Sequence, residues 1–253
     1  MYPYIHIGAS AISTFSLCAI VGVLILVFSV FTKLRKSTNM SRELYFIIPK
    51  LFAALGFGFL GSVFFDALFK IPENGTFKLS GIMFYGGLIC GIIAIIPLLC
   101  IFKENSQYSP VKWLDMLTVP FIVFHAIGRL GCFLGGCCYG RATDGVFGVI
   151  FPDNPEAGIF HYDQKVLPTQ LFEACGLIVL AVTLHFIKRE KFTAYCFAYP
   201  VMRFMLEFLR GDDRGSYLGG LSPSQLLSII IIVCAVATVI FRVVLSKRNR
   251  KTP

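Results

Sequence analysis

Apolar runs of bilayer length fill most of the sequence and restrict the chain to one class of fold. An α-helix needs about 20 mostly apolar residues to cross the hydrocarbon core of a membrane. Seven such runs are present, at 11–32, 47–69, 81–102, 113–134, 168–187, 192–209 and 222–245. Only 15% of the residues are charged and 56% are hydrophobic, which excludes a soluble globular domain. We therefore expect an all-α integral membrane protein with about seven transmembrane helices, forming a single domain over residues 1–253.

The basic residues predict how the chain is oriented in the membrane. They gather on every second loop and in the C-terminal tail, as Lys33, Arg35, Lys36, Arg42, Lys103, Lys112, Lys188, Arg189, Lys191, Lys247, Arg248, Arg250 and Lys251. The longest of the other loops, around 141–167, is acidic. The positive-inside rule then places the N-terminus and this loop outside and the C-terminus in the cytoplasm. The net charge of +9 follows from this pattern and calls for anionic lipid rather than nucleic acid.

An arginine and several glycines interrupt the fourth run. Residues 125–141 read HAIGRLGCFLGGCCYGR, where a membrane span is expected to stay apolar. A guanidinium near the hydrocarbon core is costly unless it is paired or reaches water, so Arg129 marks a candidate functional site. The glycines let the backbone bend and let a lipid head group come close. The open alternative is a glycine-rich helix end from which Arg129 extends to the membrane interface.

A second charged cluster lies in the sixth run. Tyr199, Arg203, Glu207 and Arg210 are spaced four, four and three residues apart, which places them on one face of a helix. Arg203 and Glu207 can form a local ion pair, whereas Arg129 has no obvious acid of its own in the sequence. We expect this face to point into a polar cavity, because charges rarely persist on a lipid-facing surface. An ion pair that only joins helices is the alternative.

Together, these two clusters indicate an anionic ligand with an apolar body. The planar fork of arginine suits phosphate oxygens, and a phospholipid combines a phosphate with apolar tails. If the site is catalytic, the arginines can stabilise a phosphate leaving group electrostatically. From the residues alone, we expect a membrane protein that handles phospholipid.

Three of the nine cysteines differ from the rest. Most cysteines lie inside apolar runs and are expected to be small buried hydrophobic residues. Cys132, Cys137 and Cys138 lie close to Arg129 in the sequence instead. Their C-x4-C-C spacing matches no standard zinc pattern, and no histidine pair completes one. Packing or a local disulfide is therefore favoured over a metal site, and no metal or cofactor is expected.

Several motifs, in this order and spacing, resemble the prolipoprotein diacylglyceryl transferases. They are YGGL at 85–88, GRLG at 128–131, GR at 140–141, FGVIFP at 147–152, PTQLFE at 168–173, the tyrosine, arginine and acid series at 199–210, and the segment 221–228. The resemblance implies a seven-helix bacterial inner-membrane protein with a central cavity open to lipid. It also implies transfer of a diacylglyceryl group from phosphatidylglycerol to the lipobox cysteine of a preprolipoprotein signal peptide, with release of glycerol phosphate.

The resemblance also assigns roles to residues. Arg129 and Arg203 match the two essential arginines of the family, Tyr199 and Glu207 match its tyrosine and acid, and Gly140 matches a glycine after the signature. The catalytic candidates are Arg129, Arg203, Glu207 and Tyr85. The candidates for substrate binding are Tyr199, Arg210, Gly86, Gly87, Gly128, Gly131, Gly140, Cys132 and His125.

Four positions depart from the family pattern. Tyr85 stands where the family has a catalytic histidine, Cys132 where it has an asparagine, Cys137 where it has an acid, and Phe15 where it has a tyrosine. The ordinary pKa of tyrosine is near 10, so Tyr85 needs strong activation to accept a thiol proton. Glu207 as the base, or an acceptor that is already anionic, are the other possibilities.

Histidines elsewhere offer weaker replacements for the missing base. His125 lies four residues before Arg129 and shares its helical face, although a hydrogen-bonded core residue is the favoured interpretation. His6 and His161 are expected to be exposed.

These departures keep several functions open. The favoured one is the diacylglyceryl transfer implied by the resemblance, with a different acceptor as a variant of it. The main alternative is a non-catalytic phospholipid-binding or transport protein that kept the arginines and lost the chemistry. A third hypothesis gives Cys132, Cys137 and Cys138 a redox or acyl-carrying role, because arginine favours the nucleophilic thiolate.

Overall fold

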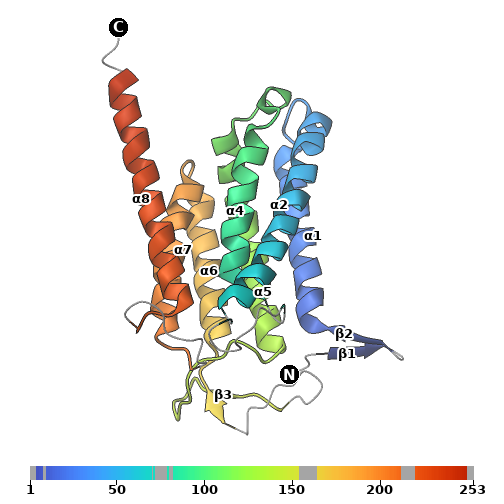
Figure 1. Ribbon diagram of the computed structural model, residues 1–253. Coiled ribbons are helices and arrows are strands. Elements are labelled where there is room, and N and C mark those ends of the chain that lie inside the picture. Colours follow the sequence, from blue (N-terminus) through green and yellow to red (C-terminus); the bar gives the residue numbers. More distant parts are fainter. Residues whose placement is uncertain are drawn as a thin grey trace. The chain divides into compact units, whose positions relative to one another are not determined.

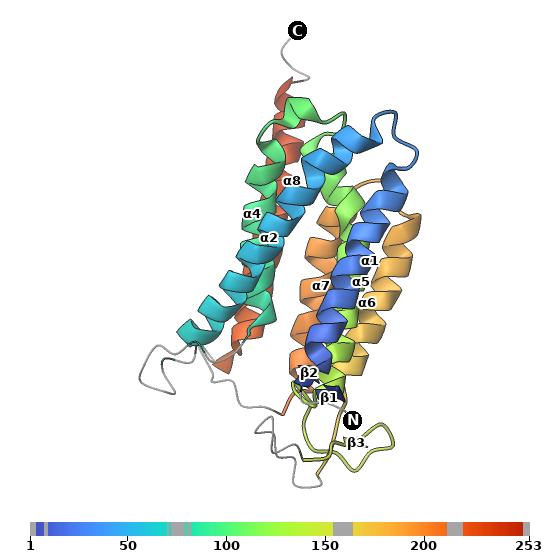
Figure 2. The same cartoon turned by 90° about the vertical axis from the view of Figure 1, so that its right-hand side faces the viewer.

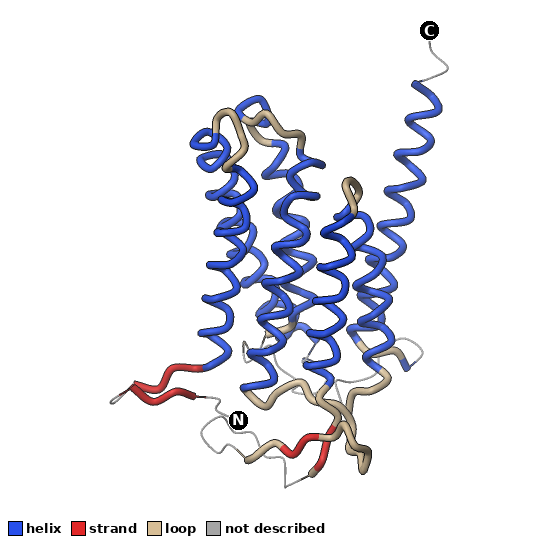
Figure 3. Tube along the Cα trace, turned by 180° about the vertical axis from the view of Figure 1, so that it is seen from behind, coloured by secondary structure: helices blue, strands red, loops and turns tan. Residues whose placement is uncertain are grey.

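The computed structural model describes residues 4–7, 10–69, 71, 79, 82–153, 164–211 and 220–249, with only the backbone at residues 7, 10 and 245–249 (Figure 1). Within these residues the seven predicted runs all form α-helices. They are α1 (Thr14–Leu34), α2 (Met40–Phe69), α4 (Phe84–Cys100), α5 (Pro110–Leu134), α6 (Thr169–Phe186), α7 (Lys191–Glu207) and α8 (Pro223–Asn249). The all-α prediction is confirmed, and Figure 3 shows how little strand accompanies the helices.

Five of the described helices, α1, α2, α5, α6 and α8, are long and apolar enough to cross a bilayer. The other two, α4 and α7, have 17 residues each, which is the lower end of the spanning range. The strands are short and antiparallel: β1 (Tyr4–Ile7) pairs with β2 (Ser10–Ser13), and β3 (Val149–Ile150) pairs with β4 (Lys165–Val166).

The ends of the first two helices differ from the predicted runs. The first run was expected to begin at residue 11, but residues 10–13 form β2 and α1 begins at Thr14. The second helix begins at Met40, before the apolar run. Its first turn contains the charged residue Glu43, which is buried and hydrogen-bonded. The Glu43 carboxylate accepts hydrogen bonds from Ser106 Oγ at 2.5 Å and from the Gln107 backbone N–H at 2.8 Å.

The chain divides into two compact units, Leu24–Pro120 and the combination of Met1–Val23 with Phe121–Pro253. In the unit 24–120, α2 and α4 pack along each other (Figure 2). The core of this unit is formed by Val30, Leu34, Phe46, Ile47, Ala54, Ile95, Leu99, Trp113 and Leu117.

Glycines bring α2 and α4 close together. A Cβ at Gly86 would lie 2.9 Å from the Gly61 carbonyl oxygen, and one at Gly87 would lie 2.9 Å from that of Gly58. Small residues at such a contact are the usual way in which membrane helices approach each other. Gly86 and Gly87, which were expected to bind substrate, therefore have a packing role here. Their neighbour Tyr85 is buried in the first turn of α4.

In the unit of 1–23 and 121–253, α6 contacts α7, and α7 contacts α8 (Figure 1). Outside the apolar stretches, Glu190 in the α6–α7 turn forms a two-pronged ion pair with Arg242 of α8, at 2.8 and 2.9 Å. Hydrogen bonds from Arg242 and then Thr193 hold the pKa of the Glu190 carboxyl below its ordinary value. Both side chains of the Glu190–Arg242 pair are about half exposed, so we expect this pair to stabilise the fold only weakly.

Candidate functional site

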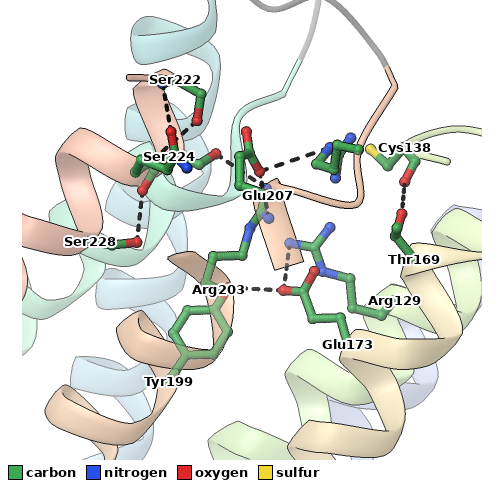
Figure 4. A network of polar contacts seen from close by, with 12 residues as sticks. Arg129, Cys138, Thr169, Glu173, Tyr199, Arg203, Glu207, Ser222, Ser224 and Ser228 are labelled. Carbon is green, nitrogen blue, oxygen red and sulfur yellow. Dashed lines mark hydrogen bonds and ion pairs between the residues drawn. The ribbon is translucent and has the colours of Figure 1, made fainter. Parts of the chain in front are cut away.

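The carboxylate of Glu173 lies at the centre of a buried polar cluster in the unit of 1–23 and 121–253. One oxygen, Oε1, is 3.0 Å from the Arg129 guanidinium and accepts a 3.0 Å hydrogen bond from the Tyr199 hydroxyl (Figure 4). These residues come from α6, α5 and α7 respectively, and none of them is more than 6% exposed. Three helices are therefore joined at one carboxylate oxygen.

This contact corrects two expectations about Arg129. The sequence suggested no acid for it, but Glu173 on α6 is its partner. An extension to the membrane interface is also wrong, since the Arg129 side chain is buried and ion-paired. Glu173 ends the PTQLFE motif at 168–173, and no role was predicted for it. A charged residue inside a predicted apolar span was the signal that could have identified it.

Arg203 joins α7 to α8. Its guanidinium lies 2.6 Å from Glu207 Oε2, which confirms the predicted pair four residues apart, and it donates a 3.2 Å hydrogen bond to Ser224 Oγ. Ser228 in turn donates to the Ser224 carbonyl oxygen at 2.7 Å, within the same helix. The sequence did not indicate Ser224, because a serine near a helix start is common and its partner lies on another helix.

Arg210 is not on the helical face where the spacing placed it. Helix α7 ends at Glu207, and Arg210 follows after a turn. Its Nε is 4.0 Å from Glu207 Oε2, so it still belongs to the charged cluster. The backbone of Arg210 pairs instead with Gly140, in an isolated antiparallel bridge.

His125 packs against the cluster as a core residue. Only 2% of it is exposed, and its ring meets that of Tyr199 edge to face at 4.9 Å between centroids. Its Nε2 is 3.7 Å from Glu173 Oε1, which is longer than a hydrogen bond. Tyr199 is further held by stacking on Tyr195, with ring centroids 5.4 Å apart. Among the weaker candidates, His6 lies on β1 and His161 lies outside the described residues.

The charges of this cluster leave room for an anion. Among the described residues it holds three guanidiniums, of Arg129, Arg203 and Arg210, and two carboxylates, of Glu173 and Glu207. In Figure 4 the side chains of Arg129 and Arg203 approach the same region from two sides, and both charges act on His125. One phosphate monoanion would balance the excess positive charge and suit the planar forks of the arginines.

The structure explains why position 140 is a glycine, which the sequence alone did not. Its N–H donates to the Leu167 carbonyl oxygen at 2.7 Å, and the Arg141 N–H donates to that of Leu209 at 2.9 Å. A Cβ at Gly140 would lie 2.6 Å from the Leu209 oxygen and 2.7 Å from Thr169 Cγ2. Glycine at this position therefore lets three backbone segments meet next to the cluster.

The two glycines that flank Arg129 differ from each other. A Cβ at Gly131 would lie 3.0 Å from Cys18 Cβ and 3.3 Å from Phe15 Cα, so Gly131 lets α1 and α5 pack closely. A Cβ at Gly128 would meet nothing within 4 Å. Of the glycines assigned to substrate binding around Arg129, only Gly128 faces the open space that such a role requires.

We expect Gly140→Ala and Gly128→Ala to have opposite effects on stability. Alanine at 140 forces overpacking against backbone and should lower the free energy of unfolding by about 1–3 kcal/mol. Alanine at 128 meets open space and improves helix propensity, so stability should stay the same or rise by up to about 1 kcal/mol. Unfolding of the two variants and the parent protein in one detergent measures this. Equal destabilisation by both variants would contradict the packing assignment.

The sulfur atoms of Cys132, Cys137 and Cys138 lie within 4.8 Å of one another. Hydrogen bonds with the Cys132 and Cys138 thiols, followed by burial, raise the pKa of the Cys137 thiol above its ordinary value. Thr169 Oγ1 and Gln170 Nε2 donate to the backbone oxygens of Cys138 and Cys137, at 3.0 and 2.7 Å. All three residues are present as thiols, not as the local disulfide that the spacing left open.

The model of one protein family, described as prolipoprotein diacylglyceryl transferase, matches residues 3–241. The chain belongs to this family. Among its diacylglyceryl transferase relatives is a phosphatidylglycerol–prolipoprotein diacylglyceryl transferase of Clostridium tetani, 32% identical over 62% of each chain. A Dehalococcoides mccartyi protein of the same name is 25% identical over 97% of this chain and 95% of its own length. A protein of the same name from Streptococcus uberis is 26% identical over 94% of this chain and 93% of its own length.

The chain spans about three fifths of the Clostridium tetani relative, 62% of its length, and about the same share, 59%, of a relative from Clostridium perfringens. Membership of the diacylglyceryl transferase family confirms the resemblance identified from the motifs. The apolar helices and these bacterial relatives together make the chain a multi-pass bacterial membrane protein.

Proposed function

We propose that the chain is a transferase that moves the diacylglyceryl group of phosphatidylglycerol to the lipobox cysteine of a preprolipoprotein. The observation that carries this proposal is the buried cluster of Arg129, Arg203 and Arg210 with Glu173 and Glu207, in a member of the diacylglyceryl transferase family. Its excess positive charge and its burial in an apolar helical protein match a substrate that joins a phosphate to fatty acyl chains. The acceptor partner is the lipobox of a signal peptide.

In this mechanism the arginines bind the phosphate and stabilise the charge that develops on it. As the bond between the glyceryl carbon and the phosphate oxygen breaks, glycerol phosphate gains negative charge. Guanidiniums already held in place by Glu173, Glu207 and Ser224 need little reorganisation to stabilise that charge, and such preorganisation accounts for large rate effects. Tyr199 and Glu173 keep Arg129 in position, and Glu207 does the same for Arg203 and Arg210.

The proton of the acceptor thiol requires a separate explanation. Glu207 and Tyr85 remain the candidates to accept it, as the sequence suggested. Tyr85 stands at the position of the family's histidine and is buried in the first turn of α4. This substitution is also the observation that favours the alternative function, a phospholipid-binding or transport protein without catalysis.

For the membrane arrangement we propose the orientation that the basic loops predict. The N-terminus and the loop around 141–167 lie outside the bacterial plasma membrane, and the C-terminus lies in the cytoplasm. The cluster of arginines then lies toward the outer leaflet, since Arg129 and Arg203 occupy the ends of α5 and α7 that lead into outer loops.

Incubation of the purified full-length protein with phosphatidylglycerol and a lipobox peptide tests the proposal. We expect a peptide heavier by one diacylglyceryl group and an equal amount of glycerol phosphate, both measured by mass spectrometry. The matched control is the same peptide with serine in place of the lipobox cysteine, which should gain no lipid. Binding of phosphatidylglycerol without either product, while a known family transferase is active in the same assay, would favour the non-catalytic alternative.

A further inference from the structure

The end of α5 and the turn after it bring together the thiols of Cys132, Cys137 and Cys138, which the proposed mechanism does not use. The conformation of Gly136 explains why these thiols meet. Gly136 has a positive φ of 70°, the Gly136 N–H donates to the Phe133 oxygen and the Cys137 N–H donates to the Cys132 oxygen. This is a Schellman motif, in which the residue after the left-handed glycine folds back over the last helical turn. Cys137 therefore lies over Cys132, although five positions separate them in the sequence.

Cys138 completes the cluster at the expense of an unfavourable backbone conformation. Its φ is +65°, in the left-handed region that non-glycine residues rarely adopt and that is often found at functional sites. Neighbouring side chains in an extended segment point to opposite sides, and this turn lets Cys137 and Cys138 point to the same side. The Thr169 and Gln170 side chains hold the carbonyl groups of both cysteines against the start of α6. The thiols are thus held by neighbouring elements as a group.

The geometry is close to that of a three-thiolate metal site. Zinc–sulfur bonds of about 2.3 Å place the sulfurs of a tetrahedral site about 3.8 Å apart. The present sulfurs are within 4.8 Å, so small side-chain rotations would close the site. Three protein ligands leave a fourth position open, which distinguishes catalytic zinc sites from structural ones. The Cys132 thiol is the most buried of the three, whereas Cys137 and Cys138 are partly accessible, which gives an ion and a fourth ligand a way in.

The surrounding charge also suits such an ion. Zinc with three thiolates would carry a net charge of −1, and Arg129, whose guanidinium belongs to the cluster, precedes Cys132 on the same helix. The Arg129 charge acts directly on Cys132 and Cys138, and Cys132 lies one helical turn after Arg129 on α5. A neighbouring guanidinium favours the anionic form of these thiols, and so favours binding of a cation by them.

We propose that Cys132, Cys137 and Cys138 bind a zinc-type divalent cation whose fourth ligand is the acceptor thiol, held as a thiolate next to the arginine cluster. The inference rests on the proposed function. It also accounts for the departures from the family pattern as a set: the histidine is replaced by Tyr85, while cysteines occupy the asparagine and acid positions. A metal that deprotonates a coordinated thiol makes a separate general base unnecessary.

The reaction balances without any further reagent. The acceptor thiol releases its proton to solvent as its sulfur takes the fourth position on the metal. An electron pair of that sulfur forms the bond to the glyceryl carbon that carries the phosphate. The bond from this carbon to the phosphate oxygen breaks, and its electron pair leaves with glycerol phosphate beside Arg129 and Arg203. The thioether product is neutral and a weak ligand, so it dissociates and the metal accepts another thiol.

Metal content and cobalt spectra of the full-length protein test the site without relying on activity. We expect about one zinc per chain after dialysis against a weak chelator, and thiolate-to-metal absorption when Co²⁺ replaces zinc. The Cys138→Ser variant should lose both signals, whereas Cys175→Ser and Cys234→Ser, which alter exposed thiols on α6 and α8, should keep them. In the parent protein, zinc should also protect these three thiols from reaction with maleimide, as mapped by mass spectrometry. This measurement tests the site even if the Cys138→Ser variant fails to fold.

Adding the lipobox peptide to the cobalt protein tests the fourth position. The cysteine peptide should change the cobalt spectrum, and its serine analogue should not. Zinc removal should slow lipid transfer by about 10²-fold, the size of effect expected from losing an acid–base group, and zinc should restore it. The zinc proposal is wrong if the metal content is unchanged in Cys138→Ser, or if zinc-stripped protein transfers lipid at the full rate. Neither result would contradict the proposed function. Cobalt and peptide binding without any glycerol phosphate release would overturn the proposed function and leave the metal site standing.

Discussion

Arg129→Lys should reduce diacylglyceryl transfer by about 10²- to 10³-fold, the effect of removing one preorganised group that stabilises developing charge. Lysine keeps the positive charge and can still pair with Glu173, so the protein should remain folded. Its ammonium is a compact point charge and lacks the planar fork that binds two phosphate oxygens at once. Initial rates of glycerol phosphate release from phosphatidylglycerol measure the effect.

The chain provides a matched control for this substitution. Arg242 also forms a two-pronged ion pair with a glutamate, but that pair is about half exposed and lies outside the cluster. Arg242→Lys should therefore transfer lipid at the rate of the parent protein. If Arg129→Lys stays within about twofold of that rate, the guanidinium geometry is not what stabilises the leaving group, and the mechanism is wrong.

Glu173→Gln should lower the free energy of unfolding by about 3 kcal/mol, because it removes the carboxylate that is paired with the buried Arg129. Glutamine has nearly the same shape and can still accept a hydrogen bond from Tyr199, so the effect isolates the charge. The contact joins α5, α6 and α7, and its loss should appear as a lower unfolding midpoint in detergent.

Glu190→Gln is the comparison that tests this argument. It removes a glutamate from an arginine pair with similar distances but at the surface, where such pairs contribute about 0.2–1 kcal/mol. The two glutamine variants should thus differ clearly in stability. Equal midpoints would mean that the Arg129–Glu173 pair stabilises the fold no more than a surface pair does.

The features that could be predicted from the sequence are local ones. Apolar length predicted all seven helices, because a bilayer requires about 20 apolar residues whatever the neighbouring helices do. A spacing of four residues predicted the Arg203–Glu207 pair, because helical geometry alone brings these side chains together. The motifs predicted the family for the same reason, since they needed only order and spacing along the chain.

The features that the sequence missed depend on contacts between distant segments. Glu173 becomes the partner of Arg129 only when α5 and α6 lie side by side, and nothing in the spacing of the two residues indicates this. The position of Arg210 depended on where α7 ends, which an apolar pattern does not define. The packing contacts of Gly86 and Gly140 were not predicted, because the absence of a side chain does not reveal which neighbouring atom requires it.

The carboxylates inside the arginine cluster also bear on how an anionic product leaves. Glu173 and Glu207 already occupy the guanidiniums, so a phosphate group has to compete with them for the same donors. If the proposed reaction holds, that competition should weaken binding of the lipid, and it should weaken binding of glycerol phosphate as well, whose second negative charge would otherwise make it a strong inhibitor. The two carboxylates would then act as built-in displacing anions, and repeated turnover in a buried arginine site would need no external counter-ion.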